Sequence, residues 1–488
     1  MTSINDPDER ALLLHEDTDS KVQTDPTPIK HQNSEAIEAL PQKNTIDILH
    51  DTLPMLIGGL CQFGMMTIDI TTVSSLGNTT MISALGLGMT WVAFTTKSVI
   101  TALNIGTLTI CSQAYGAQNL KSFQISFQRA LNLRFLGLLV SYLLLAATYW
   151  VLKAIQVEDT IATQASVFCS YSMIAMVPYL LFSTFNVFLL THKIFYPQTF
   201  FLVIALACHW FICRYFVLDL GLELRGAALA SAVSLTVAAA LTMLYSFFHS
   251  KTKNSLVTPP KESFQKLFEQ FKVEAFIGSF IYFETISTEI LSLLGSSYSE
   301  TQINAQVIVV NLINIGSVPA GGLTTVLSAY MATYMGQKDA EAIRKCVKYG
   351  IAIALIYGLL EVTCLLIWKE DLLGLYSTDS EVIQAAKEII FVYFVFIPVD
   401  YVRGVLVTTL KSIGRERIGA ITFFVSYYIV GLSLEYVLGS VVKLYDRGLW
   451  LGMGVGITSM LVNGIILLMR TDFNKQVLQI EQRIIELD

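Results

Sequence analysis

The chain has 488 residues, of which 53% are hydrophobic and only 14% are charged, and its mean hydropathy is +0.58. A soluble globular domain carries roughly 25% charged residues, so the composition excludes that class and indicates an integral membrane protein. Lysine and arginine total 32 without forming a basic run, which argues against nucleic-acid binding. The net charge of −6 is local, because residues 1–45 contain nine acids and four bases.

The cysteines and histidines give no sign of a metal, a cofactor or a catalytic nucleophile. Most of the seven cysteines lie in apolar stretches without a C-x-x-C pair, and we interpret them as small buried side chains. The six histidines are scattered, and the sequence contains neither an H-E-x-x-H motif nor a phosphate-binding loop. We therefore expect neither an enzyme nor a bound cofactor.

Residues 1–45 are polar and acidic, which favours a disordered tail without a signal peptide. Within this tail, Glu9 followed by Leu13 and Leu14 resembles the acidic dileucine signal that eukaryotic sorting adaptors bind. Because so short a pattern also occurs by chance, an incidental run of leucines is the alternative interpretation.

Twelve apolar segments follow, each with the length and hydropathy of a helix that crosses the bilayer. They predict an all-α integral membrane protein with twelve transmembrane helices. The segments are residues 51–74, 82–107, 133–153, 167–191, 198–218, 226–248, 273–295, 304–334, 350–368, 387–410, 417–439 and 448–470.

The distribution of lysine and arginine over the short loops predicts the orientation. If the N-terminus is cytoplasmic, the loops on the cytoplasmic side carry 15 of these residues and the loops on the other side carry 6. Positive residues accumulate on the cytoplasmic side, so we expect both termini there, with the plasma membrane or the vacuolar or lysosomal membrane as the location.

The first six segments and the second six are related by an internal repeat. Three matches recur at offsets of 220 to 222, namely Tyr115-Gly116-Ala117-Gln118 with Met335-Gly336-Gln337-Lys338, Pro178 with Pro398, and Arg225-Gly226 with Arg447-Gly448. Together they indicate that a six-helix unit is duplicated. Because six is even, both copies point the same way and are related by an axis along the membrane normal. We expect two pseudo-symmetric six-helix bundles, residues 46–248 and 273–470.

The segments outside these bundles are polar with apolar faces. In the link 249–272, Phe264, Leu267, Phe268 and Phe271 have helical spacing, which predicts an amphipathic helix on the cytoplasmic face. In the tail 471–488, an apolar face predicts a short surface helix, with a partner contact as the alternative; its residues are Val477, Ile480, Ile484 and Leu487.

Four carboxylates inside apolar segments are the candidate functional residues: Asp69, Glu284, Glu289 and Asp400. A carboxylate within hydrocarbon costs at least roughly 2.5 kcal/mol, so such residues usually face a cavity or a partner. The five-residue spacing of Glu284 and Glu289 places them about 140° apart on a helix, so one can line a cavity while the other pairs. Pro398 should bend the tenth segment beside Asp400, and Arg403 can pair with Asp400 across one turn.

Other intramembrane polar residues have weaker functional interpretations. Gln62, Asn186 and Asn311 are more typical of hydrogen bonds between helices than of ligand contacts. Ion pairs or helix packing are the simpler explanation for Lys97, Glu361 and Glu435. His209 stands alone and is interpreted as a hydrogen-bonded packing residue.

An ordered set of motifs resembles the multidrug and toxic compound extrusion (MATE) family of the MOP flippase superfamily. Leu53-Pro54-Met55-Leu56-Ile57 with Gln62 and Asp69 resembles the first helix of its bacterial branch. Cys111-Ser112-Gln113-Ala114-Tyr115-Gly116-Ala117 resembles the C-G-Q-A-Y-G-A of eukaryotic members, with Ser112 where glycine is usual. Further matches are Gln128-Arg129-Ala130, Phe283-Glu284, Glu289-Ile290-Leu291 and Pro398-Val399-Asp400. The resemblance covers about residues 48–470. Two positions depart from it: Asp69, which eukaryotic relatives often lack, and Lys97, where the family is usually apolar.

The resemblance implies an antiporter that exports organic cations, drugs or toxic metabolites in exchange for H⁺ or Na⁺ by alternating access. It implies that Asp69, Glu284 and Asp400 take part in cation coupling, and that Glu289 matches a second glutamate of the seventh helix. Gln62, Asn186, Asn311 and Arg403 are candidate supporting residues, and a monomer in the bilayer is expected. Buried carboxylates suit such coupling, because desolvation favours their protonated form.

Two alternatives belong to other functional classes. A lipid or lipid-linked-sugar flippase of the same superfamily would need a strongly cationic cavity to hold phosphate. A polytopic membrane acyltransferase would need a catalytic histidine, for which His209 is the sole intramembrane candidate.

Overall fold

The computed structural model describes a helical protein, and none of its described residues forms a β-strand. These residues are 41–256, 261–295, 298–377 and 379–487. The dileucine stretch with Glu9, Leu13 and Leu14 lies outside them.

The first half of the chain forms six spans. Asparagine side chains cap three of its helices, with Asn44, Asn78 and Asn119 each accepting hydrogen bonds from the first turn. The helices are α2 (Thr45–Ser74), α3 (Thr79–Val92), α4 (Ser98–Gly116), α5 (Leu120–Ala146), α6 (Thr148–Ala154), α7 (Asp159–Thr191), α8 (Tyr196–Arg214) and α9 (Glu223–Phe248). A π-helical turn, η1 (Ala93–Lys97), joins α3 to α4, and another, η2 (Tyr215–Asp219), ends α8.

The second half repeats this arrangement and adds a C-terminal helix. Its helices are α10 (Leu267–Gly295), α11 (Glu300–Gly316), α12 (Val318–Gly336), α13 (Ala340–Gly374), α14 (Ser380–Tyr393), α15 (Ile397–Ser412), α16 (Glu416–Phe424), α17 (Leu432–Tyr436), α18 (Tyr445–Met469) and α19 (Phe473–Leu487). The π-helical segments η5 (Val425–Gly431) and η6 (Val437–Val441) flank α17.

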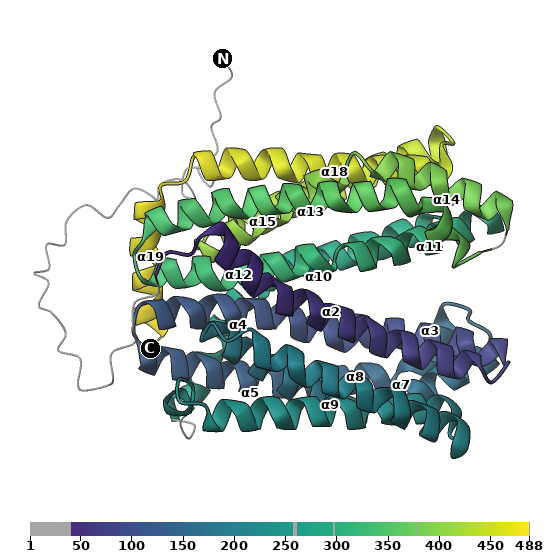
Figure 1. Ribbon diagram of the computed structural model, residues 1–488, viewed down its shortest axis with the longest axis horizontal. Coiled ribbons are helices and arrows are strands. Elements are labelled where there is room, and N and C mark those ends of the chain that lie inside the picture. Colours follow the sequence, from purple (N-terminus) through teal and green to yellow (C-terminus); the bar gives the residue numbers. More distant parts are fainter. Residues whose placement is uncertain (1–40, 257–260, 296–297, 378, 488) are drawn as a thin grey trace, which may run out of the picture. The chain divides into compact units, whose positions relative to one another are not determined.

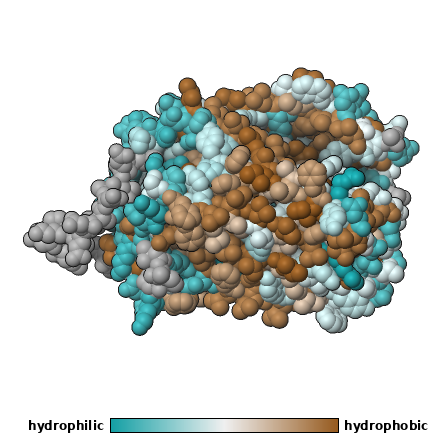
Figure 2. All heavy atoms as spheres, turned by 60° about the horizontal axis from the view of Figure 1, so that its bottom comes forward, coloured by the Kyte–Doolittle hydropathy of each residue, from teal (hydrophilic) through white to brown (hydrophobic). Residues whose placement is uncertain are grey.

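These helices form the twelve predicted transmembrane spans, and the all-α fold class is confirmed. Nine described helices are long and apolar enough to cross a membrane, and α14 with α15 makes a tenth span bent by 51°. The bend lies just before Pro398, as expected. The α3–η1–α4 unit and α10 supply the other two spans. The surface in Figure 2 has a broad apolar belt with polar residues towards both ends.

The duplication is visible in the backbone itself. The π-helical turns Tyr215–Asp219 and Val437–Val441 lie 222 residues apart. Gln118 and Lys338 both have positive φ, 58° and 62°, after α4 and α12. Two independent irregularities at the offset found in the sequence support descent from one six-helix unit.

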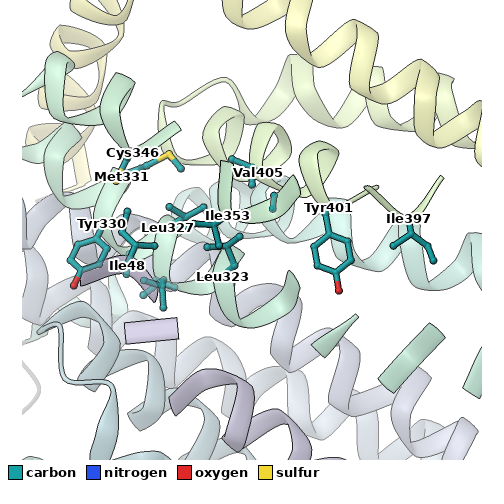
Figure 3. Close-up of a cluster of buried hydrophobic side chains, with 14 of the residues drawn as sticks. Ile48, Leu323, Leu327, Tyr330, Met331, Cys346, Ile353, Ile397, Tyr401 and Val405 are labelled. Atoms are coloured by element: carbon teal, nitrogen blue, oxygen red, sulfur yellow. The ribbon is translucent and has the colours of Figure 1, made fainter. Parts of the chain in front are cut away.

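Helices α2, α4, α10 and α12 join the two halves. In Figure 1, α5, α7, α8 and α9 lie on one side of them, and α13, α15 and α18 lie on the other. Helix α4 packs along α10 and α12, and α2 packs on both α8 and α12. The core of the second half extends into this seam, because Ile48 of α2 belongs to the cluster around Leu327 and Tyr330 of α12 (Figure 3).

Two amphipathic stretches differ from their expected form. Leu267, Phe268 and Phe271 belong to the first turns of α10, which continues into the membrane span, rather than to a separate surface helix. The C-terminal stretch is a helix as predicted, and its apolar residues Ile480 and Ile484 are buried against the bundle. Helix α19 contacts α4 and α5 of the first half and α12 and α13 of the second. We call this end of the bundle the α19 end.

Candidate functional site

A cavity of about 470 Å³ lies at the seam between the two halves. Its walls come from α2, α4, α7, α8, α10, α12 and α15, so it draws on both repeats. Most of the lining surface is apolar, and the polar contributions include Gln62, Asn104, Tyr179, Asn186, Gln198 and Lys411. Among the described residues, the lining contains one charged side chain, Lys411, and no carboxylate. The volume falls in the range of drug-sized ligand sites, roughly 300–1,000 Å³.

The α19 end of the seam is tightly closed. Gly116 of α4 and Gly336 of α12 pack so closely that a Cβ on either would overlap the backbone of the other helix, at Thr333 O and Gln113 O. The Gln113 amide also donates to Ser412 O of α15 at 2.9 Å. The repeated Tyr115–Gln118 and Met335–Lys338 motifs therefore meet at the interface between the repeats.

Asp69 sits in a buried polar cluster within the first half. His209 Nε2 of α8 is 3.1 Å from Asp69 Oδ1, Cys213 Sγ donates to the same oxygen at 3.4 Å, and Ser231 donates to Oδ2 at 3.1 Å. Ser234 lies 3.1 Å from His209 Nδ1 and orients the ring. His209 is thus the partner of Asp69, which the sequence did not indicate.

Glu284 and Asp400 share one arginine in the second half. Arg403 Nη2 lies 2.6 Å from Glu284 Oε1 of α10, and Arg403 Nε lies 2.6 Å from Asp400 Oδ1. The rings of Phe423 and Tyr427 flank the guanidinium at 5.9 and 5.6 Å. The expected Asp400–Arg403 pair is present, and it includes Glu284 as a third member.

Comparison with known proteins identifies the family of this chain. The MatE family model matches residues 54–214 and again residues 277–437, one match in each half. The chain belongs to the MatE family. The predicted resemblance is confirmed, and the two matches repeat the duplication seen in the backbone.

Relatives of the MatE chain include plant proteins. It is 27% identical to Protein DETOXIFICATION 17 of Arabidopsis thaliana over 82% of this chain and 84% of that protein. It is 24% identical to Protein DETOXIFICATION 14 of the same plant over 88% and 89%. These matches and the family identify a multi-pass efflux transporter of toxic small molecules, not an enzyme.

Solved MATE structures have the same fold. The eukaryotic MATE transporter AtDTX14 superposes with a TM-score of 0.85 at 21% identity, covering 90% of this chain and 99% of that one. The Vibrio cholerae MATE transporter VcmN in the bent form superposes with a TM-score of 0.78 at 14% identity, covering 90% and 98%. At these identities the likeness concerns the fold alone.

The remaining candidate residues of this MatE protein fall into different surroundings. Gln62 and Asn186 line the cavity, and the buried Oδ1 of Asn186 has no hydrogen-bond partner among the described residues. Glu289 is exposed on α10, with no bond to any described residue. Asn311 donates to Val307 O of its own helix, away from the cavity. Asp69, Glu284 and Asp400 lie outside the cavity lining.

A buried ion pair that connects the two halves was not predicted from the sequence. Arg134 Nη1 of α5 lies 2.8 Å from Glu274 Oε2 of α10, and both side chains are 0% exposed. Arg134 also donates to Asn104 Oδ1 at 3.0 Å and to Thr107, and Gln270 donates to Glu274 at 2.9 Å. The predicted membrane segments began at residues 133 and 273, so Arg134 and Glu274 were placed at the membrane surface.

The Asp69 cluster is also the one group of described side chains with the geometry of a metal site. Ligand atoms of Asp69, His209 and Cys213 lie within 4.8 Å of one another. All three are already hydrogen-bonded together, with the Asp69 carboxylate as the acceptor. The geometry therefore fits a hydrogen-bonded cluster as well as it fits an ion site.

Lys193 connects the halves at the α19 end and gives a pH-dependent prediction. Its ammonium donates to Ala329 O of α12 at 2.8 Å and to Thr191 O at 3.2 Å. Burial lowers the pKa of Lys193 to about 7, whereas an unfolded lysine has a pKa of about 10.4. Between these values the unfolded chain binds the extra proton, so stability should rise with pH from about 7 to 10. Thermal unfolding in detergent across this range should show a smaller rise for Lys193→Met; an equal rise in both proteins would contradict the assignment.

Proposed function

We propose that this protein is a secondary antiporter that exports drugs or toxic metabolites in exchange for H⁺ or Na⁺ by alternating access. One arrangement carries the proposal: a cavity between two duplicated halves whose own lining helices also hold carboxylates that are ion-paired or hydrogen-bonded within the protein. Helix α10 contributes Ile281 to the cavity and Glu284 to the ion pair one turn later. Helix α2 contributes Gln62 to the cavity and Asp69 to the buried cluster two turns later.

Cargo and coupling ion therefore occupy adjacent sites, and their competition is indirect. Protonation of Glu284 would release Arg403 from the ion pair that joins α10 to α15 and change the fit of these two helices. If ion binding at the carboxylates lowers the affinity for the cargo, cargo binding lowers the affinity for the ion by the same factor, because coupling between binding sites is reciprocal. The expectation that the cargo is an organic cation rests on the family resemblance alone.

The test is a gradient-driven flux with a control on the same helix. We expect Glu284→Gln to abolish dye efflux from proteoliposomes in which a pH or a Na⁺ gradient is imposed separately, because the amide neither titrates nor pairs with Arg403. Glu269→Gln is the matched control, since that carboxylate is exposed in the first turn of α10 and bonded to no described residue. Normal coupled transport by Glu284→Gln, in protein that unfolds like wild type, would refute the coupling assignment.

The orientation and the alternatives follow from the same arrangement. We propose that the α19 end faces the cytoplasm, in agreement with the positive loops, at the plasma membrane or a vacuolar or lysosomal membrane, with the protein acting as a monomer. The acyltransferase alternative is disfavoured, because His209, its candidate catalytic residue, is 0% exposed and in contact with Asp69. A flippase would have to admit a lipid to a cavity of drug size.

A further inference from the structure

We propose that the cavity between the halves selects organic anions with an apolar body, and that Lys97 and Lys411 are the residues that recognise the negative charge. This inference rests on the proposed function, since it assigns a cargo to the same transporter. It departs from the organic cations that the family resemblance implies.

The first observation is Lys411, a buried lysine without a counter-ion of its own. Its residue is 6% exposed and lines the cavity. Among the described residues, no carboxylate lies within 4 Å of its ammonium and no atom accepts a hydrogen bond from it, and the ammonium lies 5.9 Å from the centre of the Phe280 ring. Glu284 attracts it electrostatically, but that carboxylate is already bound by Arg403. A buried cation without a partner is costly, so a bound anion would supply what the protein lacks.

The second observation is Lys97, at the start of the cavity-lining face of α4. It is exposed, it ends the π-helical turn η1, and it lies one turn before Thr101, which lines the cavity. Such π-helical turns frequently mark functional sites. The Lys97 ammonium lies 5.8 Å from the ring of Tyr179, which also lines the cavity. Lys97 is also one of the two positions, with Asp69, at which the sequence departs from the family resemblance.

The third observation is that the protein's own cations already face aromatic rings in and around the cavity. Lys97 faces Tyr179, Lys411 faces Phe280, and Arg403 faces Phe423 and Tyr427. A cationic cargo would meet a lysine or arginine at each of these rings, and Phe182 is the other aromatic ring of the described cavity lining. The described carboxylates near the cavity offer no alternative, because Asp69, Glu284 and Asp400 are held by partners within their own halves.

Neutral groups around the cavity suit an oxygen-rich anion. Gln198 is 1% exposed, and its Oε1 has no described hydrogen-bond partner; the same holds for Oδ1 of Asn186 and Oγ of Ser328. All three residues line the cavity. They can accept hydrogen bonds from cargo hydroxyls, while the lysines bind a carboxylate, sulfate or phosphate. Because the cavity has the volume of a drug-sized ligand, we assign it to a soluble amphipathic anion rather than to a phospholipid.

The experiment compares two dyes of one shape and opposite charge. Fluorescein and the methyl ester of tetramethylrhodamine share a xanthene body, but the first is an anion and the second a cation. We expect the full-length protein in detergent to bind fluorescein saturably and in preference to the rhodamine. Lys97→Gln and Lys411→Met should each weaken fluorescein binding by about tenfold or more and leave rhodamine binding unchanged or stronger. Lys251→Gln, an exposed lysine in the loop after α9, is the matched control.

The outcomes separate this inference from the proposed function. Binding at equilibrium needs no ion gradient, so fluorescein binding that depends on both lysines supports the inference even if coupled transport fails. Preference for the rhodamine, binding of neither dye, or fluorescein affinity unchanged in both variants would overturn it. Lys97 is exposed, so its variant stays informative if Lys411→Met fails to fold. Rapid dithionite bleaching of a fluorescent phosphatidic acid in phosphatidylcholine proteoliposomes, without fluorescein binding, would instead identify a lipid cargo and would equally overturn it.

Discussion

Replacement of Arg134 by methionine should lower the free energy of unfolding of this protein by about 3–5 kcal/mol. The change removes one member of an ion pair whose two side chains are 0% exposed. It leaves the Glu274 carboxylate buried with the hydrogen bonds of Thr107 and Gln270 but without a cation. Because α5 belongs to the first half and α10 to the second, the loss also weakens the contact between the halves. Unfolding of the purified protein in detergent would measure the effect.

A double-mutant cycle separates the pair from its surroundings. Replacing both members, Arg134→Met with Glu274→Met, should recover most of the lost stability, because apolar residues of similar volume can substitute for a buried ion pair. The matched control is Lys338→Met, which breaks a surface pair with Glu481 whose side chains are 53% and 43% exposed. That change should cost less than about 1 kcal/mol. A cost for Arg134→Met no larger than the control's would show that the network does not hold the halves together.

The sequence predicts the features of this fold that depend on local chemistry. Apolar segments of bilayer length gave the twelve spans, and motifs at one offset gave the duplication, which the MatE matches at residues 54–214 and 277–437 repeat. The Asp400–Arg403 pair was also predictable, because residues three apart on a helix face the same way.

The partners of the buried charges could not be predicted, because they come from distant parts of the chain. Glu284 and Arg403 are 119 residues apart, and Asp69 and His209 are 140 apart. Periodicity places a residue on a face of its own helix but does not say which helix meets that face. For the same reason Arg134 and Glu274 were missed, and Lys411, one residue past the predicted segment 387–410, was assigned to a loop.

The cavity lining depended on the same long-range information. Intramembrane carboxylates were the natural candidates for a cavity, since a charge in hydrocarbon needs an explanation. In the folded protein His209 contacts Asp69, and Arg403 pairs with both Glu284 and Asp400, which accounts for these charges. The polar groups that line the cavity are instead amides, hydroxyls and the ammonium of Lys411. The type of residue was thus a good guide to burial in protein, but not to which surface each residue lines.

The second large effect should come from the two glycines that close the seam at the α19 end. A Cβ at Gly336 would overlap Gln113 O and approach Ala117 N, and a Cβ at Gly116 would overlap Thr333 O. These are backbone atoms, which cannot rotate away as a flexible side chain could. Gly336→Ala should therefore force α12 away from α4, cost about 1–3 kcal/mol of stability, and favour the conformation that is open at this end.

Cysteine alkylation can detect that opening site by site. Cys111 of α4 is 1% exposed and lies five residues before Gly116, so its reaction with a maleimide should accelerate in Gly336→Ala and in Gly116→Ala. Cys169 of α7, which is 0% exposed and hydrogen-bonds Gly88 O, should keep its rate. Gly137→Ala is the matched control, because a Cβ there meets no atom within 4 Å and alanine favours a helix. If Cys111 reacted equally slowly in all these proteins, the close approach of α4 and α12 would not be the closure that the proposed alternating access must undo. Faster reaction at Cys111 alone would identify the junction of the two repeated motifs as the part of the transporter that must separate for cargo to enter from the α19 end.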